Sequence, residues 1–224
     1  MDYKKISAYI EGLYDKNTLS KKRYSDDTEL KHYGQVIDDD VARMLQLLIM
    51  AKMPKMVLEI GTSIGYSTVA MAKMTKEYGG KIITIELDKQ VAEQARANFK
   101  RQGVDEQIEI IIGDAFAVVA DMGQHFDLIF QDVGDKTYYA KMMDSYVKLL
   151  NPGGLLLAED VLFPAFGGGD SDSYLDDVRK PLDQFNRAVA QHPQFESTLL
   201  PIGDGLMVAV KKERVLIKGE MPNE

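Results

Sequence analysis

The sequence has no cysteine, no long apolar run and fewer basic than acidic residues. Without cysteine there is no disulfide, thiolate zinc site or cysteine nucleophile, which is typical of proteins from a reducing compartment. No apolar run approaches the ~18 residues of a membrane-spanning helix, and the first residues, MDYKKISAYIEGLYDK, contain no apolar signal-peptide core. We therefore expect a cytoplasmic protein that does not cross a membrane.

Positive charge is in the minority. The 224 residues include 27 Lys and Arg against 35 Asp and Glu, a formal net charge of -8. Nonspecific nucleic-acid binding depends on clustered Lys and Arg, so the composition disfavours a broad phosphate-binding surface. A local basic patch is still compatible with this total. The length is typical of one domain with a sizeable core.

Apolar runs of strand length alternate with segments of helical period from about residue 56 to residue 210. This alternation predicts βαβ units and a mostly parallel sheet. Strands are expected at 56–60, 81–87, 107–113, 126–132, 154–160, 195–201 and 205–211. The last two are too close in sequence for a crossover helix, so they should form an antiparallel hairpin.

Helices are expected between these strands. Val91, Ala95 and Phe99 recur at i, i+4 and i+8, as on the apolar side of a helix. Val41 and Leu45 belong to a similar stripe that precedes the first strand. Further helices are expected at 65–77, 137–150 and 173–191.

Two segments fall outside this alternation. Residues 1–35 are polar and could form an N-terminal helical arm that covers a site or a partner subunit, or be a frayed terminus. The stretch from Phe163 to Asp172 contains three consecutive glycines and directly follows the fifth strand. A loop in that place either carries binding specificity or is a solvated insertion.

The most informative segment is VLEIGTSIGYS, residues 57–67. An apolar strand is followed by a glycine turn and then a helix, which is how open α/β sheets build small-molecule sites. Gly61 and Gly65 allow sharp turning and close approach because they lack Cβ. The spacing is not that of the dinucleotide fingerprint, and Glu59 before the turn would repel phosphate and attract an ammonium group.

The second and third strands also end on polar residues. Glu86 follows the glycine turn by about 20 residues, where an acidic side chain accepts hydrogen bonds from ribose hydroxyls. Asp88 is the better candidate for the helix N-cap. Gly113, Asp114 and Ala115 follow the third strand at the same sheet edge, where they would lie beside an adenine ring.

Three carboxylates come at the ends of the fourth and fifth strands: Asp132, Glu159 and Asp160. Adjacent parallel strands would bring them together, and unpaired carboxylates in proximity repel one another. A hard cation such as Mg²⁺ or Ca²⁺ would relieve that repulsion. Alternatively, Glu159 or Asp160 caps the next segment or pairs with a lysine.

These motifs together resemble those of the class I S-adenosylmethionine-dependent O-methyltransferases, in the cation-dependent group of catechol and caffeoyl-CoA O-methyltransferases. The segments that carry the resemblance, in chain order, are VLEIGTSIGYS, IELD, GDA, FDLIFQD, LLAEDVLF and LPIGDGL. The resemblance covers roughly residues 35–211. It implies an α/β, Rossmann-like seven-stranded sheet, mostly parallel with an antiparallel last strand and helices on both faces. Residues 36–224 would form the methyltransferase domain, preceded by the arm of residues 1–35.

The resemblance also implies site residues. The S-adenosylmethionine-binding set would be Val36, Glu59, Gly61, Thr62, Ser67, Glu86, Asp114, Ala115 and Asp132. Asp132, Glu159 and Asp160 would hold the divalent cation, and Asp132 and Lys136 would be catalytic. The implied reaction moves a methyl group to a hydroxyl of a small catechol-like or hydroxycinnamate-like acceptor. The resemblance also implies a homodimer, because members of this family are often dimers.

The chain departs from the family pattern at two places. Glu159 and Asp160 stand where these enzymes usually carry Asp and then Asn, which lengthens one ligand and adds a negative charge. Lys136 follows Asp132 by four residues rather than three, with Gly134 available to absorb the extra residue as a bulge; a surface lysine that opens the next helix is the competing interpretation.

The chemistry expected is attack by an acceptor oxygen on a sulfonium methyl group. A phenol titrates near ~10, so a chelating divalent cation would help to generate the oxyanion at neutral pH. The arm and the loop around 163–169 are candidates for a lid that excludes water.

Three other functions remain open from the sequence. The acceptor could be a hydroxylated uridine of tRNA, which the acidic charge disfavours. The chain could be a nicotinamide oxidoreductase, which the missing third glycine and Glu59 disfavour. It could also be a cofactor-binding module without activity, if Glu159 and Asp160 cannot form a metal site.

Overall fold

The computed structural model describes residues 3–14, 19–165 and 173–213. Its centre is a seven-stranded sheet in the order β3-β2-β1-β4-β5-β7-β6. In chain order the strands are β1 (Met56–Ile60), β2 (Lys81–Glu86), β3 (Ile108–Ile112), β4 (Phe126–Gln131), β5 (Leu150–Ala158), β6 (Phe195–Leu200) and β7 (Leu206–Lys211). Strands β1 to β5 pair in parallel, and β7 lies antiparallel between β5 and β6. The predicted Rossmann-like sheet with a reversed last strand is confirmed.

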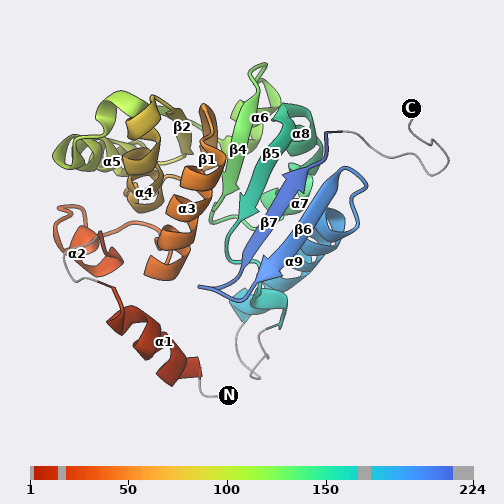
Figure 1. The fold of residues 1–224 in the computed structure, drawn as a ribbon, viewed down its shortest axis with the longest axis horizontal. Coiled ribbons are helices and arrows are strands. Elements are labelled where there is room, and N and C mark those ends of the chain that lie inside the picture. The colour runs from red at the N-terminus through yellow and green to blue at the C-terminus, as the bar shows by residue number, and fades with distance from the viewer. Residues whose placement is uncertain (1–2, 15–18, 166–172, 214–224) are drawn as a thin grey trace.

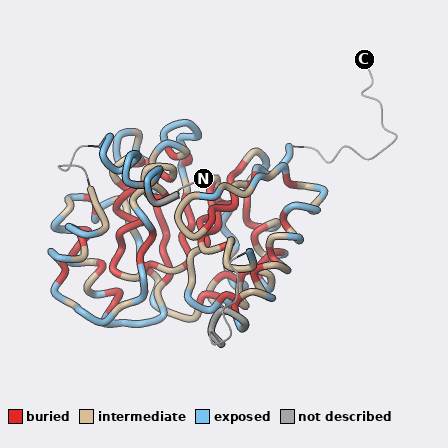
Figure 2. Tube along the Cα trace, turned by 90° about the horizontal axis from the view of Figure 1, so that it is seen from below, coloured by how far each residue is buried: buried red, intermediate tan, exposed pale blue. Residues whose placement is uncertain are grey.

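Successive strand residues point to opposite faces of this sheet and pack into two separate cores. Val57 belongs to the core under α3 (Asp39–Lys52), α4 (Tyr66–Thr75) and α5 (Lys89–Gln102). Leu58 belongs to the other core, under α6 (Ala115–Ala120), α7 (Thr137–Lys141), α8 (Met143–Leu149) and α9 (Ser173–Ala190). Figure 2 shows the buried segments concentrated in the strands, so helices cover both faces, as expected.

Helix α5 shows how local sequence sets an element. Asp88 is its N-cap and accepts hydrogen bonds from the backbone N–H groups of Gln90 and Val91, which satisfies two donors that the first turn leaves free. The stripe of Val91, Ala95 and Phe99 is buried. Gly103 ends the helix with φ 67°, a left-handed conformation that favours glycine.

Two predicted boundaries are wrong. The helix expected at 137–150 is two helices, because Met142 leaves helical geometry between α7 and α8. Strand β5 starts at Leu150 rather than at 154, and its register with β4 shifts between Phe126 and Leu128. Gly153, with φ 73°, allows the irregularity. Short 3₁₀ turns η1 (Lys76–Tyr78), η2 (Asp105–Gln107) and η3 (Phe163–Ala165) complete the described elements.

The N-terminal segment divides into two parts. Helix α1 (Tyr3–Gly12) projects from the packed core and contacts α3 through the Arg43–Glu11 ion pair, whereas α2 (Lys21–Asp26) packs against the core (Figure 1). Tyr24 of α2 is 2% exposed, its hydroxyl donates to the Ile64 carbonyl at 3.0 Å, and its ring centre lies 5.3 Å from that of Tyr66. The glycine-rich part of the expected specificity loop, residues 166–172, lies outside the described residues.

Candidate active site

The carboxyl ends of β1 to β5 meet along one edge of the sheet, which is where open α/β sheets bind ligands. Backbone hydrogen bonds extend the ladder just past the strand ends: Gly113 N to Glu86 O at 2.9 Å, Gly61 N to Ile85 O at 3.1 Å, Asp132 N to Ile60 O at 2.8 Å and Glu159 N to Gln131 O at 3.0 Å. The polar residues that follow the strands are therefore held in register by the sheet itself.

Packing requires glycine at two positions of the turn after β1. Gly61 has φ 97°, and a Cβ there would lie 2.0 Å from the carbonyl oxygen of Asp132. Gly65 has φ 86°, and a Cβ there would lie 2.2 Å from the ring of Phe99. These glycines let the end of β1 touch the end of β4 and let α4 approach α5.

Glu59 lies behind this turn and is fully buried. Its carboxylate accepts hydrogen bonds from Ser67 Oγ at 2.5 Å, Thr68 Oγ1 at 2.5 Å and Thr84 Oγ1 at 2.7 Å. Burial raises the pKa of Glu59 to about 7, although the three hydroxyl donors act in the opposite direction. Thr62 joins the same network through Thr84 at 2.7 Å.

In front of the turn, a cavity of about 960 Å³ opens along the sheet edge. Of the residues predicted to bind the cofactor, five line it: Gly61, Glu86, Asp114, Ala115 and Asp132. Glu59, Thr62 and Ser67 are buried behind its wall, and Val36 lines a small adjoining hollow beside Asp132. The structure therefore divides the predicted set into residues that face the cavity and residues that support its wall.

Backbone and side-chain contacts fix the acidic groups at one end of the cavity. Glu86 accepts hydrogen bonds from the backbone N–H of Ser63 at 2.8 Å and of Asp88 at 3.0 Å. Asp114 caps α6 through Ala117 N at 2.9 Å and accepts from the Tyr138 hydroxyl at 2.6 Å. Carboxylates held in this way are preorganised acceptors for hydroxyl and amine donors.

Three acidic residues, Asp132, Glu159 and Asp160, are called here the carboxylate cluster. Asp132 and Asp160 line the cavity, whereas Glu159 is buried and lines the small adjoining hollow with them. Each residue offers one carboxylate oxygen, and these oxygens lie within 4.8 Å of one another. Burial raises the pKa of Asp132 to about 6, against the attraction of the Lys136 ammonium. Burial, the hydrogen bond with Asp160 and the charge of Asp132 raise the pKa of Glu159 well above the usual range.

Lys136 is inserted into this cluster rather than exposed at the surface. Its side chain is 4% exposed, and Nζ lies 2.5 Å from Asp160 Oδ2, 3.9 Å from Asp132 Oδ1 and 3.1 Å from the Tyr139 hydroxyl. Burial alone would lower the pKa of Lys136, but the charges of Asp132 and Asp160 raise it above its ordinary value. Gly134, which the sequence offered as the place of a bulge, has no positive φ, and a Cβ there would meet nothing, so the fold does not require glycine at this position.

The sequence interpretation missed Asp204. It lies in the β6–β7 turn, lines the cavity, and its backbone N–H donates to Glu159 Oε1 at 3.4 Å. Burial and the charge of Asp160 raise its pKa. The segment LPIGDGL, which carries Asp204, contributed to the family resemblance and to the predicted hairpin, but no site role was predicted for Asp204. Asp204 reaches the site because β7 pairs with β5, which brings the β6–β7 turn beside the end of β5.

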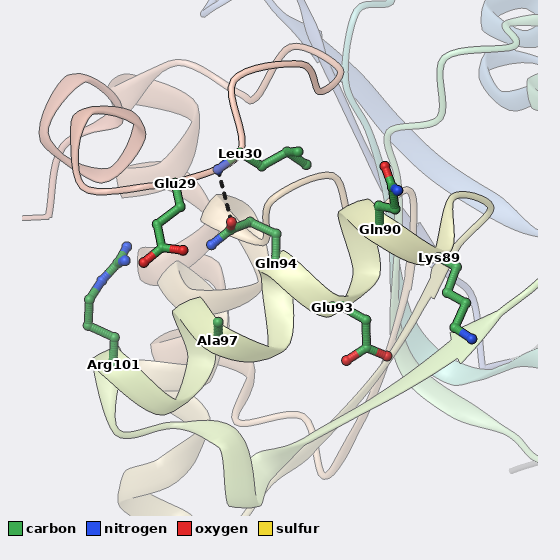
Figure 3. Close-up of a pocket in the computed structure, with 8 residues that line it drawn as sticks. All are labelled: Glu29, Leu30, Lys89, Gln90, Glu93, Gln94, Ala97 and Arg101. Carbon is green, nitrogen blue, oxygen red and sulfur yellow. Dashed lines mark hydrogen bonds between the residues drawn. The ribbon is translucent and has the colours of Figure 1, made fainter.

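A second hollow of about 800 Å³ lies on the outer side of α5 and contains none of the predicted site residues (Figure 3). Side chains of α5, including Lys89, Glu93 and Arg101, form it together with the Glu29–Leu30 stretch, which is anchored by Leu30 N donating to Gln94 Oε1 at 3.0 Å. Charges of both signs alternate here, as on an ordinary solvated helix face.

A family model for O-methyltransferases matches residues 11–212. The chain belongs to the O-methyltransferase family. The class predicted from the motifs, an S-adenosylmethionine-dependent O-methyltransferase, is confirmed, and the nicotinamide alternative has no support. The match also includes most of the residues that were expected to form a separate arm.

Relatives agree with this O-methyltransferase assignment, and a solved structure agrees with the fold. A catechol O-methyltransferase of Niastella koreensis is 29% identical, over 79% of this chain and 82% of that one. A catechol O-methyltransferase of Mycobacterium tuberculosis is 30% identical, over 70% of each. The structure of a Podospora anserina methyltransferase has a TM-score of 0.80 at 23% identity, with 94% of this chain and 95% of that one covered. Among the described helices, none is both long and apolar enough to cross a membrane.

Proposed function

We propose that this O-methyltransferase transfers the methyl group of S-adenosylmethionine to a hydroxyl of a small catechol-like or hydroxycinnamate-like acceptor, with a divalent cation at the carboxylate cluster. One observation carries the proposal. A single cavity of about 960 Å³ connects the acidic residues after β2 and β3 with Asp132, Asp160 and Lys136 after β4 and β5. Its size is within the range of small-molecule sites.

The residues that line the cavity fit the methyl donor. Glu86, fixed by two backbone donors, would accept the ribose hydroxyls, and Asp114 with Ala115 would border the adenine. Gly61 and Asp132 would hold the methionine part. Bound there, S-adenosylmethionine supplies a sulfonium methyl group, which an acceptor oxygen takes as it loses its proton, leaving a thioether. The Podospora anserina neighbour is described as bound to S-adenosylhomocysteine, which supports this choice of donor.

The carboxylate cluster fits a hard divalent cation. Three carboxylates with oxygens within 4.8 Å of one another are a typical oxygen donor set for Mg²⁺ or Ca²⁺. A cation there would be held by Asp132, Glu159 and Asp160, and it would supply Lewis-acid activation of a hydroxyl that it chelates. Two hydrogen bonds hold the longer Glu159 beside the other two carboxylates: its backbone N–H donates to Gln131 O at 3.0 Å, and its Oε1 accepts from Asp204 N at 3.4 Å.

Asp132 and Lys136 are the proposed catalytic residues. Asp132 lines the cavity next to Gly61, so its carboxylate can attract the positively charged donor. The Lys136 ammonium, placed by Asp160 and Tyr139, would stabilise the negative oxygen of the acceptor. Lys136 can accept a proton only after it loses its contact with Asp160, because that contact favours the charged form.

Two described segments would shape the acceptor side. Tyr33 and Gln35, before α3, line the cavity from one side, and Phe163 of η3 lines it after β5. Both Tyr33 and Phe163 therefore contribute an aromatic side chain to the lining of the cavity. The names of the relatives, catechol and caffeoyl-CoA O-methyltransferases, support an aromatic vicinal diol as acceptor.

A methyl-transfer assay tests the proposal. Purified protein is mixed with radiolabelled S-adenosylmethionine and, in separate reactions, a catechol, a hydroxycinnamate, its coenzyme A thioester, and tRNA that carries hydroxyuridine. We expect transfer to the small diols with Mg²⁺ and a loss of at least about 100-fold with EDTA or in Asp132→Ala, since removing a catalytic cation or its ligand removes several kcal/mol of transition-state stabilisation. Transfer only to tRNA would contradict the acceptor class, and transfer unchanged by EDTA would contradict the cation.

We also propose that the chain forms a homodimer. Helix α1 and the turn after it expose Tyr9 (68%) and Leu13 (61%), and α3 exposes Leu47 (62%) and Met50 (50%). Helix α1 is tied to α3 by Arg43, which pairs with Glu11 at 2.5 Å. A second copy of this chain that covers these side chains would remove a substantial apolar area from water.

A further inference from the structure

Lys136 forms an ion pair with Asp160, one of the three carboxylates that would bind a divalent cation. Its Nζ hydrogen-bonds Asp160 Oδ2 at 2.5 Å and lies 3.9 Å from Asp132 Oδ1, so one ammonium already neutralises part of the cluster. The side chain is 4% exposed, and the Tyr139 hydroxyl at 3.1 Å fixes it further. Lys136 is therefore a resident counter-ion of the carboxylate cluster.

Asp160 can serve this lysine because of its own backbone. It follows β5 with φ 64°, a left-handed conformation that Asp tolerates better than most residues. That conformation turns its carboxylate toward Lys136 at the start of α7. Burial alone would raise the pKa of Asp160, but the hydrogen bond with Glu159 and the Lys136 ammonium hold it below the usual range. The ion pair thus joins the loop after β4, which carries Lys136, to the loop after β5, which carries Asp160.

A divalent cation and this ammonium cannot share the cluster without repulsion. Oxygen ligands of Mg²⁺ and Ca²⁺ lie about 2.0–2.6 Å from the ion. A cation bound by three carboxylates whose oxygens are within 4.8 Å of one another would therefore lie only a few ångströms from Nζ. Repulsion between like charges at such distances is strong in a partly buried site.

We propose that Lys136 and the divalent cation compete for Asp160, so that metal binding requires the Lys136–Asp160 ion pair to open. The inference rests on the cation site of the proposed function. In the metal-free protein, the ion pair keeps the cluster ordered and partly neutral. With a divalent cation present, the ammonium is released from Asp160 while Tyr139 and Asp132 remain nearby. Lys136 thereby sets how much cation is needed to fill the site.

Calorimetric titration with Mg²⁺, without methyl donor or acceptor, tests the competition. We expect Lys136→Met to bind Mg²⁺ at least about tenfold more tightly than the wild type, because one nearby positive charge has been removed. Lys141→Met is the matched control. It removes the same charge from an exposed position on α7, where Lys141 Nζ contacts only Thr137 Oγ1 among the hydrogen bonds of the described residues, and it should bind Mg²⁺ like the wild type.

A double-mutant cycle with Asp160→Asn shows whether the effect passes through Asp160. The amide cannot hold Lys136 as an ion pair, so the tightening caused by Lys136→Met should be at least about threefold smaller in the Asp160→Asn background. Three results would each overturn the proposal. Lys136→Met could bind Mg²⁺ no more tightly than the wild type, its gain in Mg²⁺ affinity could be the same with Asp160 and with Asn at that position, or no variant could bind Mg²⁺.

Two measurements keep the test decisive. Thermal melts establish that each variant is folded, with Lys136→Gln as the replacement if Lys136→Met is not. If neither folds, a crystal structure of the wild type soaked with Mn²⁺ decides, since an intact hydrogen bond between Nζ and Asp160 beside bound Mn²⁺ would refute the competition. Methyl transfer measured with Mg²⁺ and with EDTA separates this failure from failure of the proposed function. EDTA-sensitive transfer beside an unchanged Mg²⁺ affinity of Lys136→Met refutes the competition alone, whereas transfer unchanged by EDTA refutes the cation site itself.

Discussion

At the scale of single residues, Glu59 is buried among hydroxyl donors, whereas its predicted role is direct contact with the cofactor. Its position before the glycine turn predicts attraction of an ammonium group, and the structure places it in a closed network with Ser67, Thr68 and Thr84. Its contribution to a ligand would therefore be indirect, through the position of the turn. The direct role in cofactor binding stays a prediction.

The buried Glu59 carboxyl should make stability depend on pH. Burial raises its pKa from 4.5 to about 7 in the folded chain, so the folded state binds the proton more tightly than the unfolded state. The stabilisation from that proton is complete below about pH 4.5 and is lost as the pH rises through about 7. Glu59→Gln cannot ionise, so its free energy of unfolding relative to the wild type should increase over this range, by on the order of 3 kcal/mol.

Urea unfolding at several pH values measures this difference. Glu77→Gln, at an exposed position of η1, is the control for removal of one carboxylate. A Glu59→Gln curve parallel to that of the wild type from pH 4.5 to pH 7.5 would show that the carboxyl is not protonated by burial.

At the scale of elements, the N-terminal residues belong to two structural classes. Helix α2 is part of the packed molecule and the stretch that ends at Gln35 reaches the cavity, whereas α1 projects from the core (Figure 1). The polar composition of residues 1–35 concealed this division, because a single aromatic residue, Tyr24, provides much of the packing of α2.

Substitutions of two tyrosines should reveal this division. Tyr24→Ala removes a buried ring and its hydrogen bond to Ile64 O, and it should lower the free energy of unfolding by about 3 kcal/mol or more. Tyr9→Ala, on α1, removes a ring that is 68% exposed and should leave monomer stability within about 0.5 kcal/mol. Urea denaturation at a protein concentration low enough to give monomers measures both. Similar losses for the two variants would mean that α1 is packed as tightly as α2.

At the scale of the whole molecule, the exposed apolar side chains of α1 and α3 have no explanation within one chain. Their pairing in a homodimer predicts a light-scattering mass of about twice the 25.1 kDa of the chain. The double variant Tyr9→Glu/Leu13→Glu should shift the protein to a monomer, because it places charge in the apolar surface. Ile112→Glu, at an exposed position of the edge strand β3, is the control and should remain dimeric. A wild type that is monomeric at high concentration would refute the dimer.

The positions of the strands along the chain, the antiparallel hairpin and the class of enzyme could be predicted from the sequence. Strand-length apolar runs, the short β6–β7 connection and the ordered motifs are local patterns, and each records which backbone conformation and which burial a segment prefers. The cap Asp88 and the stripe on α5 were predicted for the same reason. Wrong boundaries occurred where local preference is overruled, as at Met142 and at the irregular start of β5.

The sequence also predicted that Asp132, Glu159 and Asp160 converge, because parallel neighbours end at one sheet edge. It left the environment of Lys136 undecided between a site residue and a surface lysine. Only the tertiary structure buries that lysine against Asp160, through the left-handed backbone of Asp160 and the start of α7.

The sequence by itself therefore determined the sheet, the family and the row of polar residues at the strand ends. The tertiary structure decided which of these residues face the cavity and which support its wall. It also decided that the Lys136 ammonium lies within the carboxylate cluster. The physical reason is that backbone preference and apolar periodicity act between near neighbours in the chain. Side-chain direction, burial and ion pairing depend on atoms contributed by distant segments, as the contacts of Lys136 and Glu59 show.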